Sequence, residues 1–418
     1  MKATTEKAFG ANLQSVFSNP CEKWQMKKLG EVCAIIGGGT PSKANTSFYG
    51  GDILWATVRD MKNDYLDDTE YKITLEAVQN SSTNIIPANN VIIATRVGLG
   101  KACFLKHNTA INQDLKALIP LNEKFLDVFY LFWWFKNISP KIVKAGTGAT
   151  VQGVKIPFLQ NLQIPVPPLP EQHRIVSILD EAFTEIDKAK KNTEENIKKN
   201  KELFEAKLQS VFANLGSDWK EDCIGNLCDL MTGGTPSRTE KEYFDDGDIP
   251  WLVSGDVNTK EIFDCEGRIT ELGMKNSNAK YLPINSVLIA LNGQGKTRGT
   301  VAKLRMKATC NQSIVSIYPK DLKKINADYI YHNLNARYQE IRKITSDSGN
   351  DRRGLNMPLI KNIKVSYPSS LQEQLLLVQK FDKMQNERSN LELIYNQKLT
   401  QLEELKKSIL KQAFEGKL

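Results

Sequence analysis

The chain has 418 residues, of which 41% are hydrophobic and 25% charged, and its formal net charge is +8 at pH 7. This length is too great for one ordinary hydrophobic core, so two or three domains are expected. No stretch approaches the eighteen apolar residues of a membrane span and no signal-peptide region is visible, which predicts a cytoplasmic protein without membrane contact. The modest basic excess favours an acidic partner such as nucleic acid.

Residues 1–19 are predicted to form a short N-terminal helical segment, and residues 20–169 the first globular domain. Within that domain, short apolar runs at 53–55, 91–94 and 115–119 are separated by Gly, Asn, Asp and Pro, which is typical of strands and turns. The apolar stretch 125–135 predicts a buried helix. Residues 217–369 repeat this organisation as a second domain, with residues 329–344 in the equivalent helical place.

A long central helix is predicted over residues 170–216, because no Gly or Pro occurs between residues 171 and 212. Its apolar residues alternate in steps of four and three, as in a coiled coil: Ile175, Leu179, Ala182, Ile186 and Ala189. The pattern weakens through Thr193, Asn196 and Asn200 and resumes at Leu203/Phe204, Leu208 and Val211. This polar centre has two open interpretations, a device that fixes the register or a solvated waist.

The C-terminal segment 370–418 predicts a second helix of the same kind. Its four-three alternation runs without a break through Leu377, Phe381, Met384, Arg388, Leu391, Tyr395, Lys398, Leu402, Leu405 and Ile409. A helix of about 40 residues is roughly 60 Å long and would expose its apolar stripe if it stood alone. We therefore expect the two helices to pair as an antiparallel coiled coil. The fold class is α+β, with two similar α/β domains joined by these helices.

An internal repeat supports this organisation. Gly38-Gly39-Thr40-Pro41-Ser42 recurs as residues 233–237, and the Gly-Asp-Ile-x-Trp segment 51–55 recurs as 247–251. Further pairs follow in the same order: 91–94 with 287–290, 112–113 with 311–312, Gly-x-x-x-Pro 153–157 with 354–358, and Glu-Gln 171–172 with 373–374. The repeat is also circular, because residues 13–17 match 208–212. The chain is therefore a duplicated module.

Polar residues in the loops of each domain are the candidate DNA contacts. Arg can bind the edge of guanine through two hydrogen bonds, Asn and Gln can do so with adenine, and Lys more often meets phosphate. In the first domain the candidates are Thr40, Ser42, Lys43, Arg59, Arg96, Lys101, Lys144, Thr147, Thr150, Gln152 and Lys155. In the second they are Thr235, Ser237, Arg238, Asn292, Gln294, Lys296, Arg298, Asn350, Arg352, Arg353 and Asn356.

We expect at most half of these residues to touch DNA, because several can cap turns or face water. The Gly-Gly-Thr-Pro-Ser segments are interpreted as structural turns, and Trp55 and Trp251 as core anchors.

The sequence contains no recognisable catalytic centre. The seven Cys form no Cys-x-x-Cys pair, which argues against a metal site or disulfides, and the three His lack counterparts in the repeat. The segment 290–297 resembles a phosphate-binding loop, but Ala290 stands where its first Gly is required. No dinucleotide-binding or adenine-methyltransferase motif appears.

These motifs make the chain similar to the specificity subunits of type I restriction-modification systems. The resemblance rests on both Gly-Gly-Thr-Pro-Ser turns, both Gly-Asp-Ile-x-Trp segments, the strand-to-helix junctions 167–172 and 371–374, and the C-terminal run 405–414. It covers essentially the whole chain. Two departures are the missing second proline at the second junction and Pro250 after the second Gly-Asp-Ile.

The resemblance implies a non-catalytic DNA-recognition subunit with two target recognition domains, each reading one half of a bipartite site on double-stranded DNA. It further implies that the helices set the spacer and dock two methyltransferase subunits, joined by motor-nuclease subunits. S-adenosylmethionine and ATP are expected on those partners and no cofactor on this chain. The alternatives are a nucleotide-dependent enzyme with duplicated Gly-Lys loops and a coiled-coil scaffold.

Overall fold

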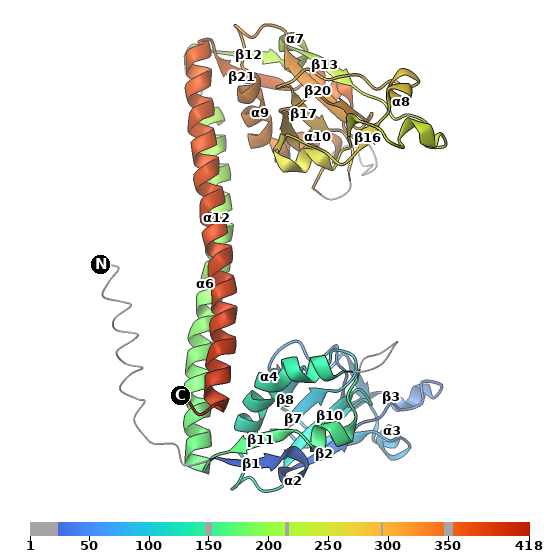
Figure 1. Cartoon of the computed structure of the whole chain (residues 1–418), viewed down its shortest axis with the longest axis vertical. Coiled ribbons are helices and arrows are strands. Elements are labelled where there is room, and N and C mark those ends of the chain that lie inside the picture. Colours follow the sequence, from blue (N-terminus) through green and yellow to red (C-terminus); the bar gives the residue numbers. More distant parts are fainter. Residues whose placement is uncertain (1–23, 147–152, 214–216, 294–295, 347–353) are drawn as a thin grey trace, which may run out of the picture. The chain divides into compact units, whose positions relative to one another are not determined.

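The computed structural model describes residues 24–146, 153–213, 217–293, 296–346 and 354–418 (Figure 1). The chain divides into two compact units, one comprising residues up to 193 together with 397–418, the other residues 194–396. Each unit therefore contains one globular domain and half of each long helix. The helical segment predicted at residues 1–19 lies outside the described residues.

The first domain is built on three sheets. A five-stranded sheet has the order β2 (Cys33–Gly37), β10 (Leu115–Pro120), β7 (Val91–Ala94), β8 (Ala102–Leu105), β4 (Tyr65–Leu66). A four-stranded sheet has the order β5 (Tyr71–Ile73), β3 (Tyr49–Ala56), β9 (Thr109–Ile111), β6 (Asn84–Ile86), and β1 (Gln25–Lys28) pairs with β11 (Gln163–Val166). The helical elements are α2 (Leu29–Val32), η1 (Thr46–Phe48), α3 (Leu75–Gln79), α4 (Val128–Ala145) and α5 (Ile156–Gln160).

The second domain repeats this topology. Its five-stranded sheet has the order β13 (Cys228–Thr232), β20 (Ile314–Pro319), β17 (Val287–Ala290), β18 (Val301–Leu304), β15 (Glu261–Ile262). A three-stranded sheet has the order β16 (Arg268–Ile269), β14 (Ile249–Leu252), β19 (Thr309–Cys310), and β12 (Trp219–Cys223) pairs with β21 (Lys364–Pro368). The helical elements are α7 (Ile224–Leu227), η2 (Lys241–Tyr243), η3 (Asp256–Thr259), α8 (Glu271–Lys275), α9 (Ala327–Ala336), α10 (Tyr338–Ser346) and α11 (Met357–Lys361). The equivalent strand orders confirm the duplication.

The helix predicted in each domain is present, with different bounds. In α4 the carboxylate of Asp127 accepts the backbone N–H of Tyr130 at 2.8 Å and so caps the helix, which begins at 128 rather than 125. The buried side chains of this helix pack in the main core of the first unit. In the second domain the expected single helix is two, α9 and α10, because Arg337 leaves helical geometry with φ −98° and ψ 18°.

Two long helices, α6 (Leu169–Ala213) and α12 (Leu371–Phe414), confirm the predicted pair. In the first unit Lys406 binds Asp187 at 3.1 Å and Lys190 binds Glu403. In the second unit the Asn200 side chain donates to the Arg388 carbonyl oxygen at 3.1 Å. The Phe204 ring contacts the Arg388 guanidinium group in the same unit, and the Phe212 ring packs on Phe381. In each unit partner numbers therefore rise on one helix as they fall on the other, so the helices are antiparallel within each unit.

The seam of α12, meaning the face that it turns towards α6, differs from the prediction at three of the ten predicted positions, Leu391, Lys398 and Leu405. The other seven are buried or half-buried as expected: Leu377, Phe381, Met384, Arg388, Tyr395, Leu402 and Ile409. From Arg388 onwards the buried or half-buried residues come four positions later, not three, at 392, 399, 406 and 413. The predicted Leu391 and Leu405 are therefore 42% and 46% exposed. The residue pattern alone missed this because both spacings satisfy a heptad repeat.

The polar centre of α6 contains buried as well as exposed residues. Thr193 is buried and its hydroxyl donates to the Ala189 carbonyl oxygen, whereas Asn196 is exposed and Ile197 takes the half-buried place. Asn200 bonds across to α12. This supports the register interpretation over the solvated waist.

A fully buried glutamine joins each domain to its long helix. Gln172 donates to the carbonyl oxygens of Phe125 and Pro167 at 2.9 and 2.8 Å and accepts from the Asp127 N–H at 2.8 Å. Gln374 repeats all three bonds with Lys324, Pro368 and Asn326, at 3.0, 3.0 and 2.9 Å. These joints explain why the glutamine of the Glu-Gln pair recurs in the sequence.

Candidate nucleic-acid interface

The Gly-Gly-Thr-Pro-Ser turn of each domain is fixed by a buried tryptophan. The indole N–H of Trp55 donates to the Gly39 carbonyl oxygen at 3.2 Å, and that of Trp251 to Gly234 at 3.0 Å. A Cβ on Gly38 would lie 2.1 Å from the Ile111 carbonyl oxygen, so glycine is required for the backbones to approach. The turns are structural, as interpreted from the sequence.

A threonine–glutamine pair is repeated beside these turns. The Thr40 hydroxyl donates to the Gln113 side-chain oxygen, and the Thr235 hydroxyl to Gln312 at 2.5 Å. The two glutamines come from the Asn-Gln pair of the internal repeat. The sequence thus keeps the same polar contact at the surface of both domains.

In the first domain the pair borders a cavity of about 690 Å³. Three predicted candidates line it, namely Thr40, Lys43 and Arg59, together with the exposed residues Tyr71 and Val97. Lys43 and Arg59 are exposed and supply positive charge. A concave surface with cations and an aromatic face suits a polyanion that carries flat bases.

Arg96 lies at the edge of this cavity. Its Nη1 is 3.4 Å from the Asp114 carboxylate, which lines the cavity. Behind them, Lys116 donates to the Gln113 backbone carbonyl oxygen at 3.0 Å, and burial lowers the pKa of this ammonium group. The carboxylate therefore holds one corner of the guanidinium group and leaves the half-exposed remainder facing solvent.

The other first-domain candidates are exposed or lie outside the described residues. Lys101 is exposed, Lys144 is exposed in the last turn of α4, and Lys155 is the exposed residue before α5. Ser42 is exposed in the turn. Thr147, Thr150 and Gln152 lie outside the described residues.

In the second domain, Ser237, Arg238, Asn292 and Lys296 are exposed. Arg298 is half-buried, and within the described residues its buried Nε has no hydrogen-bond partner. The Asn356 side-chain oxygen accepts the Leu359 N–H at 3.0 Å and caps α11, so a capping role accounts for this candidate. Gln294, Asn350, Arg352 and Arg353 lie outside the described residues.

Tyr71, Gln113 and Asp114 also line the cavity and were not among the predicted contacts. The repeat could have indicated Gln113, because Asn-Gln occurs in both halves. Tyr71 carried no such signal, because the residue at the equivalent position is Gly267. The carbonyl oxygen of Gly267 accepts the backbone N–H of Trp251.

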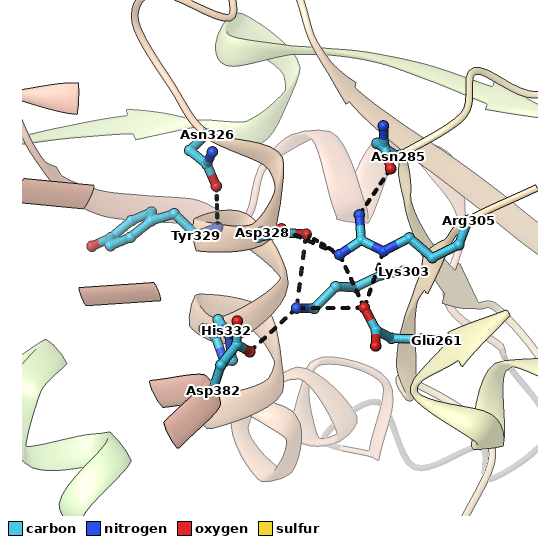
Figure 2. A network of polar contacts seen from close by, with 9 residues as sticks. All are labelled: Glu261, Asn285, Lys303, Arg305, Asn326, Asp328, Tyr329, His332 and Asp382. Atoms are coloured by element: carbon cyan, nitrogen blue, oxygen red, sulfur yellow. Dashed lines mark hydrogen bonds and ion pairs between the residues drawn. The ribbon is translucent and has the colours of Figure 1, made fainter. Parts of the chain in front are cut away.

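An ionic network around the buried Lys303 ties the second domain to α12 (Figure 2). The Lys303 ammonium is 3.9, 3.8 and 3.3 Å from the carboxylates of Glu261, Asp328 and Asp382. His332 Nε2 is 2.9 Å from Asp382, and its hydrogen bond, followed by nearby Lys303, lowers the pKa of that carboxyl group. Because Lys303 and His332 Nε2 are both paired with carboxylates, we interpret the network as structural.

The described residues contain no group of three His, Cys, Asp or Glu side chains suited to a metal ion. Burial raises the pKa of the Cys33, Cys103, Cys228 and Cys310 thiols to about 12. They are therefore not nucleophiles at neutral pH. In the described part of the chain, no helix combines the length and apolarity needed to cross a bilayer.

The domain of type I restriction-modification DNA specificity subunits matches twice, at residues 21–199 and 216–404. The chain belongs to this family. The two matched regions correspond to the two halves of the internal repeat, so each recognition domain is matched together with a long helix.

Relatives with similar sequences are specificity subunits of type I restriction enzymes. The MjaIX subunit of Methanocaldococcus jannaschii is 24% identical over 68% of this chain and 70% of its own length. The EcoR124I/EcoR124II subunit of Escherichia coli is 40% identical over 38% of this chain and 41% of its own. The MjaVIII subunit of M. jannaschii is 23% identical over 95% of this chain and 93% of its own length.

Solved structures share the fold. The HsdS subunit of Thermoanaerobacter tengcongensis has a TM-score of 0.62 and 19% identity, covering 96% of this chain and 99% of that one. A chain from a study of complex assembly and conformational transition of the type I R-M system has a TM-score of 0.76 and 20% identity. The match covers 96% of this chain and 100% of that one. The fold of two recognition domains with long helices is therefore that of the family.

Proposed function

We propose that this chain selects the DNA site of a type I restriction-modification complex, with each recognition domain reading one half of a bipartite sequence. The observation that carries this function is the duplicated domain itself. Both copies keep the tryptophan-held turn and the Thr–Gln pair, while residues around them differ, as in the exposed Tyr71 and the half-buried Gly267. Two similar scaffolds with different surfaces suit two different half-sites.

We infer that the paired helices set the spacer and bind two methyltransferase subunits. Support comes from α12, which leaves large apolar side chains exposed, among them Leu376, Leu391, Leu393 and Ile394. Exposed apolar groups at this density are typical of a surface that a protein partner covers. Motor-nuclease subunits would join the same assembly.

We assign the chemistry to those partners. S-adenosylmethionine would be bound by the methyltransferase subunits and ATP by the motor subunits, with this chain acting in the cytoplasm as a non-catalytic subunit without a cofactor. The duplicated-enzyme alternative is not favoured, because the Thr–Gln pairs and turns lack a nucleophile or acid–base pair. A scaffold alone does not explain the cationic cavity.

The test is to express this chain with its methyltransferase subunit in cells that lack other adenine methylation, and to sequence the modified bases. A bipartite methylated motif that appears only when both proteins are present is the expected result. Methylation without this chain, a continuous motif, or no motif would contradict the function.

Binding of purified chain and methyltransferase to DNA separates recognition from scaffolding. A recognition subunit should give site-specific binding whose affinity falls steeply with salt, because phosphate contacts release counterions. A scaffold should give neither specificity nor a steep slope.

A further inference from the structure

Arg96 and Asn292 occupy the same place in the two recognition domains. The residue before each donates its N–H across the sheet, Thr95 to Asp114 at 2.9 Å and Leu291 to Ser313 at 2.8 Å. The same residue accepts the N–H of the segment before the next short helix, from Val154 at 2.9 Å and from Leu355 at 2.9 Å. Two matched backbone bonds fix the equivalence independently of the sequence alignment.

A glycine clears the space beside each of these side chains. A Cβ on Gly153 would lie 3.2 Å from the Arg96 Cγ, and one on Gly354 would lie 1.8 Å from the Asn292 side-chain oxygen. These are the glycines of the repeated Gly-x-x-x-Pro segments. Both domains therefore hold a polar side chain at the same exposed strand end, against a residue without a side chain.

The chemistry at this position changes in a matched way. In the first domain Arg96 faces Asp114, which fixes its guanidinium group at 3.4 Å. In the second domain the equivalents are Asn292 and Ser313, and among the described residues Asn292 has no hydrogen-bond partner for its carboxamide. The guanidinium group of Arg96 in the first domain offers only hydrogen-bond donors. The carboxamide of Asn292 in the second domain offers both a donor and an acceptor.

The exposed position directly after the turn does not change in this way. Lys43 and Arg238 both follow the Gly-Gly-Thr-Pro-Ser turn and are both exposed cations. A cation kept in both domains suits phosphate, which is the same in every sequence, whereas a position that alternates between Arg and Asn suits the bases.

We propose that this position reads one base pair in each half-site, with Arg96 binding guanine and Asn292 binding adenine. The proposal rests on the proposed function as a DNA-recognition subunit. Arg matches the two acceptors on the major-groove edge of guanine, and Asn matches the donor and acceptor of adenine. Asp114 is a positioning residue that orients the Arg96 fork.

The experiment compares methylated motifs from cells that express the methyltransferase subunit with the wild-type chain, Arg96→Asn, Arg96→Asn with Asp114→Ser, or Asn292→Ala. In Arg96→Asn one guanine of one half-site should lose roughly a ten- to hundred-fold preference over other bases. With Asp114→Ser added, adenine should be accepted there. Asn292→Ala should relax one adenine in the other half-site only.

Lys43→Asn is the matched control, since it replaces an exposed cation of the same domain by the same residue. It should leave the motif unchanged, weaken DNA binding for all sequences, and reduce the slope of log affinity against log salt by about one. The unaltered half-site in each variant shows that the chain has folded and assembled.

An unchanged motif in Arg96→Asn, with affinity reduced as in Lys43→Asn, would make Arg96 a phosphate contact and overturn the proposal. Changes in both half-sites from one substitution would also overturn it. A wild-type chain that yields no bipartite motif would instead refute the proposed function.

Discussion

Phe104 and Lys303 occupy equivalent strand positions in the two domains, yet one is aromatic and the other charged. Phe104 in β8 pairs in parallel register with Tyr65, and Lys303 in β18 pairs with Glu261. The Phe104 ring lies 5.5 Å from that of Tyr65 and 4.4 Å from that of Phe132. Lys303 instead lies among three carboxylates. The same part of the fold is thus stabilised by ring packing in one domain and by ion pairing in the other.

Replacing Lys303 by Met should destabilise the second unit by about 1–3 kcal/mol. The side chain of Lys303 is 7% exposed, and its removal leaves Glu261, Asp328 and Asp382 close together with less compensating charge. We place the cost below that of a fully buried pair because these carboxylates are partly solvated. Urea denaturation, combined with hydrogen exchange of the amides in β18 and α9, measures this loss in the free energy of unfolding. Lys307→Met, at an exposed site, is the control, and equal stability of the two variants would contradict the prediction.

Asp180 and Asp382 are equivalent carboxylates that should affect stability in opposite directions as pH changes. Asp180 accepts the Trp133 indole N–H at 3.0 Å, and burial raises its pKa, whereas the hydrogen bond from His332 lowers the pKa of Asp382. A lowered folded-state pKa gives stability that is present above the unfolded value of about 3.9 and is lost as pH falls through the folded value. A raised folded-state pKa gives stability that is lost as pH rises from about 3.9 through the folded value.

Asp382→Asn should therefore reduce the fall in the free energy of unfolding that occurs as pH drops below about 4. Asp180→Asn should reduce the fall that occurs as pH rises above about 4. Urea midpoints followed by tryptophan fluorescence between about pH 3 and pH 6 test both variants against the wild type. Parallel curves for wild type and either variant would show that the carboxylate concerned does not couple folding to protonation.

Leu402 and Leu405 test the seam of α12. Leu402 is half-buried and packs against the core of the first unit, whereas Leu405 is 46% exposed. Leu402→Ala should cost about 1–3 kcal/mol through lost burial, and Leu405→Ala less than about 1 kcal/mol. Thermal or urea unfolding of the two variants makes a matched comparison, because the chemical change is identical. A larger cost at Leu405 would restore the seam predicted from the sequence.

Shortening both helices by one heptad should change the spacer of the DNA site and leave both half-sites intact. Removing residues 192–198 and 393–399 together preserves the four-three alternation on each helix and shortens each by about 10.5 Å. Since a base pair rises about 3.4 Å, we expect the spacer to shorten by up to about three base pairs. Sequencing of methylated bases measures the spacer length. A motif with altered half-sites would contradict a spacer role for the helices.

The internal repeat predicted much of the architecture, because residues recur in both halves where the fold needs the same contact twice. Gly39 and Trp55, like Gly234 and Trp251, recur because each indole N–H must reach the carbonyl oxygen of its turn. Gln172 recurs because three backbone groups depend on it. Positions that the two halves share could therefore be recognised from sequence as parts of one scaffold.

Positions that the halves do not share were the ones that the sequence left undetermined. Tyr71 reaches the cavity only because β5 pairs with β3, a relationship between strands that no local pattern reveals. The choice between Leu391 and Glu392 on the seam depends on how α12 is rotated against α6, and either residue continues the heptads. Long-range pairing and helix rotation were thus decided by tertiary packing.

The buried glutamine joints have an evolutionary consequence. Gln172 and Gln374 hold their domains through the same three bonds, and all of their partners are backbone atoms. A backbone group is present whatever side chain an incoming domain carries there. Genetic recombination at these junctions could therefore exchange whole recognition domains without remaking the attachment, so that a cell acquires a new target by shuffling existing parts.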